Sequence, residues 1–206
     1  MNGATRNPVF TIGHSTHALP IFITLLQKNG ITALADVRSA PYSRFNPQFN
    51  RETLTKAVAA YQIKYVFLGE ELGARSKDPS CYENGRVQYQ RLAKTSMFKE
   101  GLERVMRGSA EYTIALMCAE REPLECHRTL LVARALAEQG ISVLHILSDG
   151  RAEPHELTMQ RLLEAVDLPR QDLFRSKEEL MTEALVKQEE RIAYVDERMA
   201  GDGGHA

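Results

Sequence analysis

Two cysteines and a histidine lie within ten residues of one another in the segment 118–128, whose sequence is CAEREPLECHR. An apolar run typical of a strand precedes this segment, and a helical pattern follows it. A cysteine that ends a strand and faces a helix N-terminus has its thiolate stabilised by the helix dipole and by nearby cations. Cys118 is therefore a candidate nucleophile, Glu120 an alternative nucleophile or base, and His127 a candidate proton carrier.

The same residue types also suit a metal site. Cys118, Cys126 and His127 could bind zinc or iron, with a further ligand such as His14. Their spacing is not that of a zinc knuckle, so the sequence predicts no cofactor and leaves a bound metal as an alternative. A third interpretation is structural, because free cysteines are often simply buried.

A second polar segment, residues 38–51, reads RSAPYSRFNPQFNR and contains three arginines and no acidic residue. Arginine binds phosphate or carboxylate through two parallel hydrogen bonds, and the interleaved aromatic rings could stack on bases. The segment therefore predicts a small anionic or nucleotide-like ligand, with Arg38 and Arg44 binding the anion. The alternative is a structural loop whose arginines pair with Asp36 or with glutamates.

Short apolar runs alternate with longer segments of helical period, which is typical of a parallel sheet covered by helices. The sequence predicts an α/β fold with an open, mostly parallel sheet of about five strands, helices on both faces and additional C-terminal helices. The predicted strands are 9–12, 33–37, 64–68, 112–117 and 142–147. A first helix is predicted between the first two strands, with Leu19, Phe22, Ile23 and Leu26 on its apolar face. The other predicted helices cover 51–60, 98–106, 128–138, 155–166 and 177–199.

Ligands of open parallel sheets bind outside the carboxyl ends of the strands. The residues that directly follow the predicted strands, from His14 to Asp149, should therefore lie along one edge of the sheet. His14 is a second candidate proton carrier at this edge. The candidate substrate-binding residues are Ser15, Asp36, Arg38, Ser43, Arg44, Gly69 and Arg128.

The chain is expected to form one α/β domain over residues 1–168, a helical extension over 169–199 and a disordered tail over 200–206. The stretch 69–86 should be mostly loop, and a loop of that length is more often a lid or binding element than a plain connection. The last helix carries an apolar stripe that either packs on its own domain or forms a homodimer contact. The stripe consists of Met181, Leu185, Gln188, Ile192 and Val195.

Composition excludes several classes of protein. The 206 residues contain 26 basic and 27 acidic side chains, so overall charge does not indicate a nucleic-acid or membrane-surface protein, and any basic patch must be local. No apolar run is long enough to span a membrane, and the first residues lack the features of a signal peptide. Three irregularly spaced cysteines do not form a disulfide framework, and a cytoplasmic location is expected.

Several separated motifs resemble the domain of unknown function 488 family over roughly residues 9–158. The motifs are TIGHS (11–15), DVRSAPYSR (36–44), NPQFN (46–50), YVFLGEELGAR (65–75), LMCAE (116–120) and CHR (126–128). The resemblance implies a bacterial or archaeal cytosolic protein with one α/β domain, but it assigns no activity. A weaker likeness to rhodanese-type domains would make Cys118 the nucleophile, although the glutamates of its loop would repel an anion.

These observations predict an uncharacterised enzyme, a hydrolase or transferase, that acts on a phosphorylated, nucleotide-like or nucleic-acid substrate at the strand ends. Cleavage of a glycosidic bond through Glu120 is a variant of this hypothesis. The alternative is a non-catalytic module that binds a metal through Cys118, Cys126 and His127, or a nucleic acid through residues 38–51.

Overall fold

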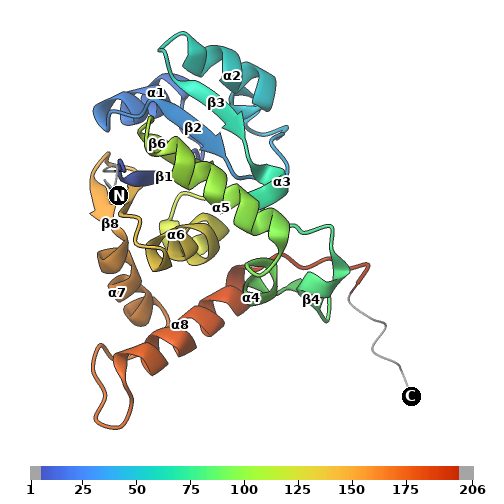
Figure 1. The fold of residues 1–206 in the computed structure, drawn as a ribbon, viewed down its shortest axis with the longest axis vertical. Helices are drawn as coiled ribbons and strands as arrows, with labels where there is room; N and C mark the ends of the chain where they lie inside the picture. The colour runs from blue at the N-terminus through green and yellow to red at the C-terminus, as the bar shows by residue number, and fades with distance from the viewer. Residues whose placement is uncertain (1–5, 200–206) are drawn as a thin grey trace, which may run out of the picture.

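A six-stranded sheet forms the centre of the protein in a computed structural model that describes residues 6–199 (Figure 1). The strand order is β3-β2-β6-β1-β7-β8. Five strands run parallel, as the sequence predicts, and β8 pairs antiparallel with β7. The strands are β1 (Val9–Gly13), β2 (Ala33–Asp36), β3 (Lys64–Phe67), β6 (Ile114–Cys118), β7 (Val143–Ile146) and β8 (Ala152–Pro154).

Helices cover both faces of the sheet, which confirms the predicted architecture. On one face, α1 (Leu19–Lys28) and α2 (Arg51–Ala59) bury a core that includes Phe22 and Leu54 against the sheet. On the other face, α5 (Ser96–Gly108) and α6 (Arg134–Glu138) bury Leu102 and Leu136 in a second, larger core. The remaining helical segments are η1 (Pro47–Phe49), α3 (Gly69–Leu72), η2 (Pro79–Cys81), α4 (Tyr89–Leu92), η3 (Pro123–Glu125), η4 (Arg128–Ala133), α7 (His155–Ala165) and α8 (Lys177–Ile192).

Two elements differ from the sequence-based prediction near the carboxyl end of the sheet. Strand β8 was not expected, because Ala-Glu-Pro has no alternating apolar pattern and forms a strand only by pairing with β7. The helix expected over 128–138 begins with the π-helical segment η4 before it continues as α6. Such π-helical segments are rare and frequently occur at functional sites.

The stretch 69–86 contains more structure than the predicted loop. It starts with the single turn of α3 and ends in a small antiparallel hairpin of β4 (Tyr82–Glu83) and β5 (Arg86–Val87). Gly69 has to be a glycine, since a Cβ atom there would lie 2.0 Å from the carbonyl oxygen of Arg38. The stretch is therefore docked against the end of β2.

The last helix is shorter than predicted, and the prediction that it reaches Met199 was wrong. Helix α8 ends at Ile192, and the following residues pair with the β4–β5 hairpin instead. The amide of Val87 donates to the carbonyl of Tyr194 (3.0 Å), and the amide of Asp196 donates to that of Gly85 (2.8 Å). Tertiary pairing has overridden a local helical pattern here. We call residues 193–199 the C-terminal strap.

Helix α8 packs on its own chain. Leu180 and Ala184 are fully buried in the larger core, and Ser176 and Glu179 form a capping box at the helix start. The residues of the expected stripe are buried or half-buried up to Ile192, whereas Val195 is exposed in the strap. A homodimer through this helix stays a prediction, and the expected tail at 200–206 lies outside the described residues.

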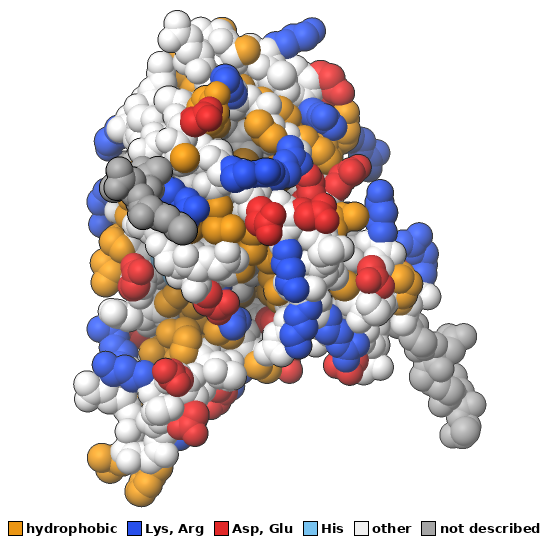
Figure 2. Space-filling view, viewed as in Figure 1, with side chains coloured by type: hydrophobic (Ala, Val, Ile, Leu, Met, Phe, Trp, Pro, Cys, Tyr) orange, Lys and Arg blue, Asp and Glu red, His pale blue; other side chains and the backbone are white. Residues whose placement is uncertain are grey.

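The face seen in Figure 2 carries charges of both signs, with Lys and Arg side chains interspersed with Asp and Glu side chains. Neither sign of charge dominates this face. Hydrophobic side chains project at the tip of the loop between α7 and α8, where Leu173 and Phe174 are 94% and 93% exposed. None of the helices formed by residues 6–199 is long and apolar enough to cross a membrane.

A chain of buried polar groups crosses the sheet beside the core. Oγ1 of Thr11 lies 2.8 Å from Nδ1 of His145, whose Nε2 lies 3.0 Å from Nδ1 of His155. Burial and the neighbouring His155 lower the pKa of His145 to about 2. Below pH 6.5, the unfolded chain therefore binds a proton at this position that the folded protein does not bind.

Acidification should consequently destabilise the fold through His145. The stability that depends on a neutral His145 is fully present above pH 6.5. As the pH falls from 6.5 towards 2, the free energy of unfolding should decrease by about 1.4 kcal/mol per pH unit. Urea unfolding between pH 7 and pH 4 should show a shallower pH dependence in His145→Gln than in the unmodified protein. Burial also lowers the pKa of the half-buried His17, so His17→Gln serves as the comparison and should change the slope less than His145→Gln does. An unchanged slope in His145→Gln would contradict the assignment.

Candidate functional site

The carboxyl ends of the five parallel strands lie on one edge of the sheet, as predicted, and a cavity of about 240 Å³ opens there. Its wall includes Arg38, which follows β2, and Cys118 and Glu120 at the end of β6. Asp149, which follows β7, lines a different depression together with Arg151. The strand ends therefore share an edge, but only some of them share a site.

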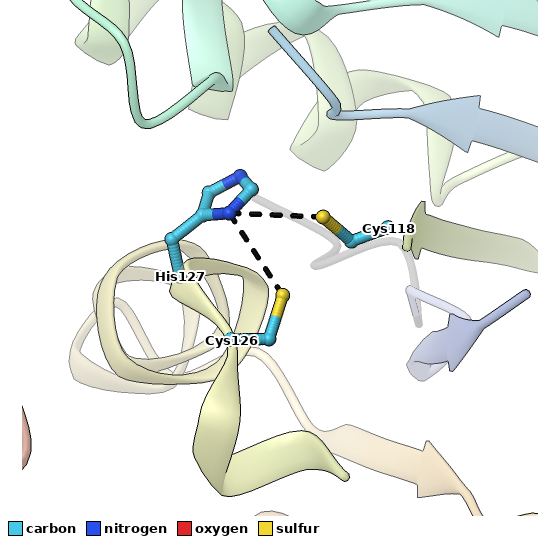
Figure 3. Close-up of side chains that lie close together, drawn as sticks. All are labelled: Cys118, Cys126 and His127. Atoms are coloured by element: carbon cyan, nitrogen blue, oxygen red, sulfur yellow. Dashed lines mark hydrogen bonds between the residues drawn. The ribbon is translucent and has the colours of Figure 1, made fainter. Parts of the chain in front are cut away.

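Cys118, Cys126 and His127 form a compact cluster at the bottom of this cavity (Figure 3). Nδ1 of His127 lies 3.7 Å from Sγ of Cys118 and 3.8 Å from Sγ of Cys126. The three potential ligand atoms all lie within 4.8 Å of one another. The exposed fractions are 3%, 1% and 8%, so the cluster is almost closed to solvent.

A tight reversal of the chain brings the two cysteines together. Cys118 ends β6, and the chain then turns through η3, where the Glu122 carboxylate accepts from the amide of Leu124. The turn returns Cys126 to the position beside Cys118 and starts η4 immediately after His127. Gly13 makes this crossing possible, because a Cβ atom there would lie 1.9 Å from the carbonyl oxygen of Glu120.

A hydrogen bond to the main chain fixes the orientation of the His127 ring. Its Nε2 lies 3.1 Å from the carbonyl oxygen of Val37, at the end of β2. A carbonyl oxygen can only accept, so Nε2 carries a hydrogen and Nδ1 faces both sulfurs. Burial opposes protonation of the ring, but the neighbouring Cys126 outweighs it and raises the pKa of His127. Nδ1 presents a lone pair to the sulfurs, and to a metal, when the ring is neutral. This arrangement, with one ring nitrogen anchored and the other free, is typical of histidines that bind metals.

The thiols differ in acidity. Burial raises the pKa of Cys118 well above its ordinary value. Burial also opposes ionisation of Cys126, but hydrogen bonding from Cys118 and the cations of Arg128 and His127 outweigh it, so the pKa of Cys126 lies well below its ordinary value. The low pKa expected for Cys118 therefore belongs to Cys126, because Cys126 is the residue at the helix start.

Glu120 shares a proton with Cys126. Sγ of Cys126 lies 3.0 Å from Oε2 of Glu120, and burial together with Cys126 raises the pKa of this carboxyl group. Either the thiol donates to the carboxylate or the carboxyl group donates to the thiolate. Glu120 also lines the cavity, so its carboxyl group reaches both the cluster and any bound ligand.

Arg128 supports the site from below and does not line the cavity. Its side chain is fully buried, and its guanidinium donates to the carbonyl oxygens of Glu120 (2.7 Å) and Arg121 (3.3 Å). Its backbone amide donates to Sγ of Cys126 at 3.4 Å. Arg128 therefore clamps the turn that carries the cluster, and its role in substrate binding stays a prediction.

Arg38 is also engaged within the protein. Its guanidinium donates to both carboxylate oxygens of the buried Asp36, to the carbonyl of Phe49 and to Nε2 of His14. The Tyr65 hydroxyl completes the group by donating to Asp36 at 2.7 Å. This is the structural alternative that the sequence left open for the arginine.

His14 has no free ring nitrogen. Nδ1 donates to the carbonyl of Ser15 (2.8 Å), Nε2 accepts from Arg38, and the ring stacks on Phe49. Burial lowers the pKa of His14 to about 4. A role of His14 in proton transfer stays a prediction, but the structure places it behind Arg38 and outside the cavity wall.

The other predicted binding residues are dispersed. The amide of Ser15 donates to the carbonyl of Ala119 and so joins β1 to the site loop. Ser43 forms a local turn by accepting from the amides of Phe45 and Asn46, and Arg44 is exposed away from the cavity. Gly69 lines a neighbouring cavity of about 640 Å³.

Sequence reasoning missed several residues of the cavity wall because they come from distant elements. Arg75 follows α3, Tyr89 begins α4, and Ile192 and Tyr194 come from the end of α8 and the strap. Arg75 is the last residue of the motif YVFLGEELGAR (65–75), and this position was the available sequence signal for a functional role. Nothing in the local pattern around Tyr89 or Tyr194 indicated that both residues line the same cavity as the cluster.

The cluster has dimensions that suit a tetrahedral metal ion. With Zn–S bonds of about 2.3 Å and Zn–N bonds of about 2.0 Å, tetrahedral geometry separates sulfur from nitrogen by about 3.5 Å. The observed distances of 3.7 and 3.8 Å come close to this value. Two sulfurs and one imidazole nitrogen form a donor set that zinc prefers. Cys118, Cys126 and His127 could therefore hold a metal.

Comparison with known proteins yields one match. A family model described as "Domain of unknown function DUF488" matches residues 19–135, which is more than half of the chain. No curated protein and no solved structure matches the chain. The matched region contains α1, the β2 end, Arg75, Tyr89 and the complete cluster. The chain therefore belongs to the domain of unknown function 488 family.

Proposed function

We propose that the protein is a metal-dependent hydrolase and that Cys118, Cys126 and His127 bind its metal, most suitably zinc. The orientation of His127 carries this proposal, because its anchored Nε2 leaves Nδ1 facing two sulfurs at near-tetrahedral distances. Three protein ligands with a fourth position open to a cavity are typical of catalytic zinc sites, whereas structural sites are closed by four.

A metal in this position would supply an activated water molecule. Glu120 is placed to hold a proton next to that water, since its carboxyl group lines the cavity and lies 3.0 Å from Sγ of Cys126. A zinc ion with two cysteines and a histidine, assisted by a glutamate that is not a ligand, is also the machinery of hydrolytic deaminases. The combination favours hydrolysis over group transfer.

The proposal is tested by metal content and by hydrolysis of simple activated substrates. The purified protein should contain about one zinc per chain and should hydrolyse p-nitrophenyl acetate or p-nitrophenyl phosphate in its zinc-loaded form. Glu120→Gln should keep the zinc and lose about 10²–10⁴-fold in rate, which is the usual effect of removing a positioned acid or base.

Glu125→Gln provides the matched control, because Glu125 lines the same cavity as Glu120 but, among residues 6–199, makes no hydrogen bond to the cluster. Its zinc content and rate should stay close to those of the unmodified protein. Loss of zinc in Glu120→Gln would make Glu120 a ligand. Full zinc occupancy without hydrolysis of either ester would reduce the cluster to a structural metal site.

A transferase with a cysteine nucleophile is the second candidate, and the lowered pKa of Cys126 favours it. In that case the metal-free protein is the active form. Iodoacetamide should then alkylate Cys126 selectively below pH 8, since the thiolate is the reactive species. Protection of Cys126 by stoichiometric zinc would favour the hydrolase instead.

The proposal also includes a cytoplasmic location and a small anionic substrate. All three cysteines are free thiols, which suits the reducing conditions of the cytoplasm. A nucleic-acid substrate stays a prediction that draws no support from Arg38, which is engaged with Asp36, or from the mixed charge visible in Figure 2. A small phosphorylated or otherwise anionic substrate fits the cavity better.

A further inference from the structure

The cavity wall contains further polar residues that the proposed hydrolysis does not use. Arg75, Tyr89 and Tyr194 line the same 240 Å³ space as Cys118 and Cys126. They come from three elements that are distant in the sequence, and their side chains carry groups that can bind a ligand.

Tyr89 lines this space and carries a hydroxyl that has no hydrogen-bond partner among the described residues. The residue is 4% exposed, and its backbone amide is held by the Glu189 carboxylate at 2.6 Å. Its hydroxyl makes no hydrogen bond with any of residues 6–199, yet it is not sealed among protein atoms. Because buried hydroxyls almost always find partners, this hydroxyl is expected to bind a ligand in the cavity.

Arg75 is a cation without an acidic partner among the described residues. Its guanidinium stacks on the ring of Tyr194 at 4.5 Å, which leaves the N–H groups along its edge free to donate. Its backbone amide donates to Oγ of Ser39 at 3.0 Å, so the main chain at this position is anchored. The other arginine of the wall, Arg38, is engaged with Asp36.

A larger cavity of about 640 Å³ adjoins the first, since both are lined by Ser39 and Arg75. Its wall carries the apolar surfaces of Tyr42, Phe67 and Met97. The smaller cavity admits only a small group, whereas the larger one has the volume of an ordinary ligand site. Arg75 stands where the two spaces meet.

We propose that Arg75 and Tyr89 bind a carboxylate or phosphate group of the substrate and that the organic remainder of the substrate occupies the larger cavity. This inference rests on the proposed function for the reaction and names the substrate class. Guanidinium and phenol together provide the directed donors that an oxyanion requires. Glu120 and Glu125 line the same space and oppose an anion, so the guanidinium of Arg75 has to offset them. A bound zinc ion would assist by neutralising the thiolates of the cluster.

Calorimetric titration of the zinc-loaded full chain tests the proposal with inorganic phosphate, phenyl phosphate and benzoate as probes. Phenyl phosphate should bind more tightly than inorganic phosphate, and removal of zinc should weaken both. Arg75→Gln and Tyr89→Phe should each weaken binding by roughly 10–100-fold, as expected for a hydrogen bond to a charged group. Arg44→Gln, in an exposed arginine outside both cavities, should leave binding unchanged.

The outcomes separate this inference from the proposed function. A protein that holds zinc but binds none of the three probes overturns the inference alone, whereas a protein that binds phenyl phosphate but holds no zinc overturns the hydrolase. Equal losses in Arg44→Gln and Arg75→Gln also overturn the assignment. Binding of benzoate without phenyl phosphate supports it and identifies a carboxylate as the group. Unchanged thermal unfolding of Tyr89→Phe shows that a loss of binding is local.

Discussion

Cys126→Ser is expected to abolish stoichiometric zinc binding. The substitution replaces the sulfur of one of the three ligand atoms that lie within 4.8 Å of one another by a hydroxyl oxygen, which is a much poorer zinc ligand than a thiolate. Changes in residues that only support a ligand cost about 10–100-fold in metal affinity, and loss of the ligand itself should exceed that. Metal analysis after dialysis against a weak chelator should show about one zinc per chain before the substitution and almost none after it.

Cobalt provides an independent readout for the same prediction. Cobalt substituted into the unmodified protein should show thiolate-to-metal absorption, and Cys118→Ser should reduce the intensity per metal because one thiolate remains. Cys81→Ser is the matched control, since Cys81 is equally buried but belongs to the core near the β4–β5 hairpin. Retention of full zinc affinity in both Cys118→Ser and Cys126→Ser would exclude the cluster as the metal site.

The strands and the edge of the sheet that holds the site were predictable from sequence because they depend on local patterns. Apolar runs such as the one that ends at Cys118 are buried on both faces of a parallel sheet, and polar residues follow them directly. Parallel strands place their carboxyl ends together in any strand order. The location of the site therefore required no knowledge of the tertiary contacts.

The division of roles within the site was not predictable in the same way. Spacing alone favoured Cys118 as the reactive thiol, but the turn through η3 places Cys126 at the helix start beside the Arg128 amide. The acidity of the two thiols depends on distances of a few ångströms that only the folded turn sets. The anchor on His127 comes from the carbonyl of Val37, which is 90 residues away in the chain.

The residues that we propose to bind an anion differ from those that the sequence favours, for a related reason. Arg38 and Arg44 stood out because they lie in a basic segment, yet Arg38 is engaged with an acid only two residues before it. Arg75 lies in a segment that also contains acidic residues, so net charge concealed it. Tyr194 reaches the cavity only because the strap leaves the helical path and pairs with the hairpin.

Asp36→Ala should destabilise the fold more than any change of a surface charge. Asp36 is completely buried and accepts hydrogen bonds from Arg38 and Tyr65. Its removal therefore leaves a guanidinium and a hydroxyl in the interior without their acceptor. Breaking a buried pair from one side costs about 3–5 kcal/mol. Urea unfolding at pH 7 should therefore show a loss of this size in the free energy of unfolding.

Two further variants separate the charge effect from loss of packing. Asp149→Ala removes the acid of a solvent-exposed pair with Arg151 and should lower the free energy of unfolding far less than Asp36→Ala does. The double variant Asp36→Ala with Arg38→Met should recover part of the loss, because it leaves no unpaired charge in the core. If the double variant is less stable than Asp36→Ala alone, the penalty comes from packing and the argument from the buried charge is wrong.

The same pair should affect the metal site, because Val37 lies between Asp36 and Arg38 and its carbonyl oxygen anchors His127. When the pair is lost, the end of β2 is no longer held, and the ring of His127 gains freedom to turn Nδ1 away from the two sulfurs. Loss of such an anchor typically costs 10–100-fold in metal affinity. Zinc competition with a chromogenic chelator, under conditions where Asp36→Ala is still folded, should show a loss in this range. Unchanged zinc affinity in the folded variant would mean that β2 holds Val37 through its strand pairing alone.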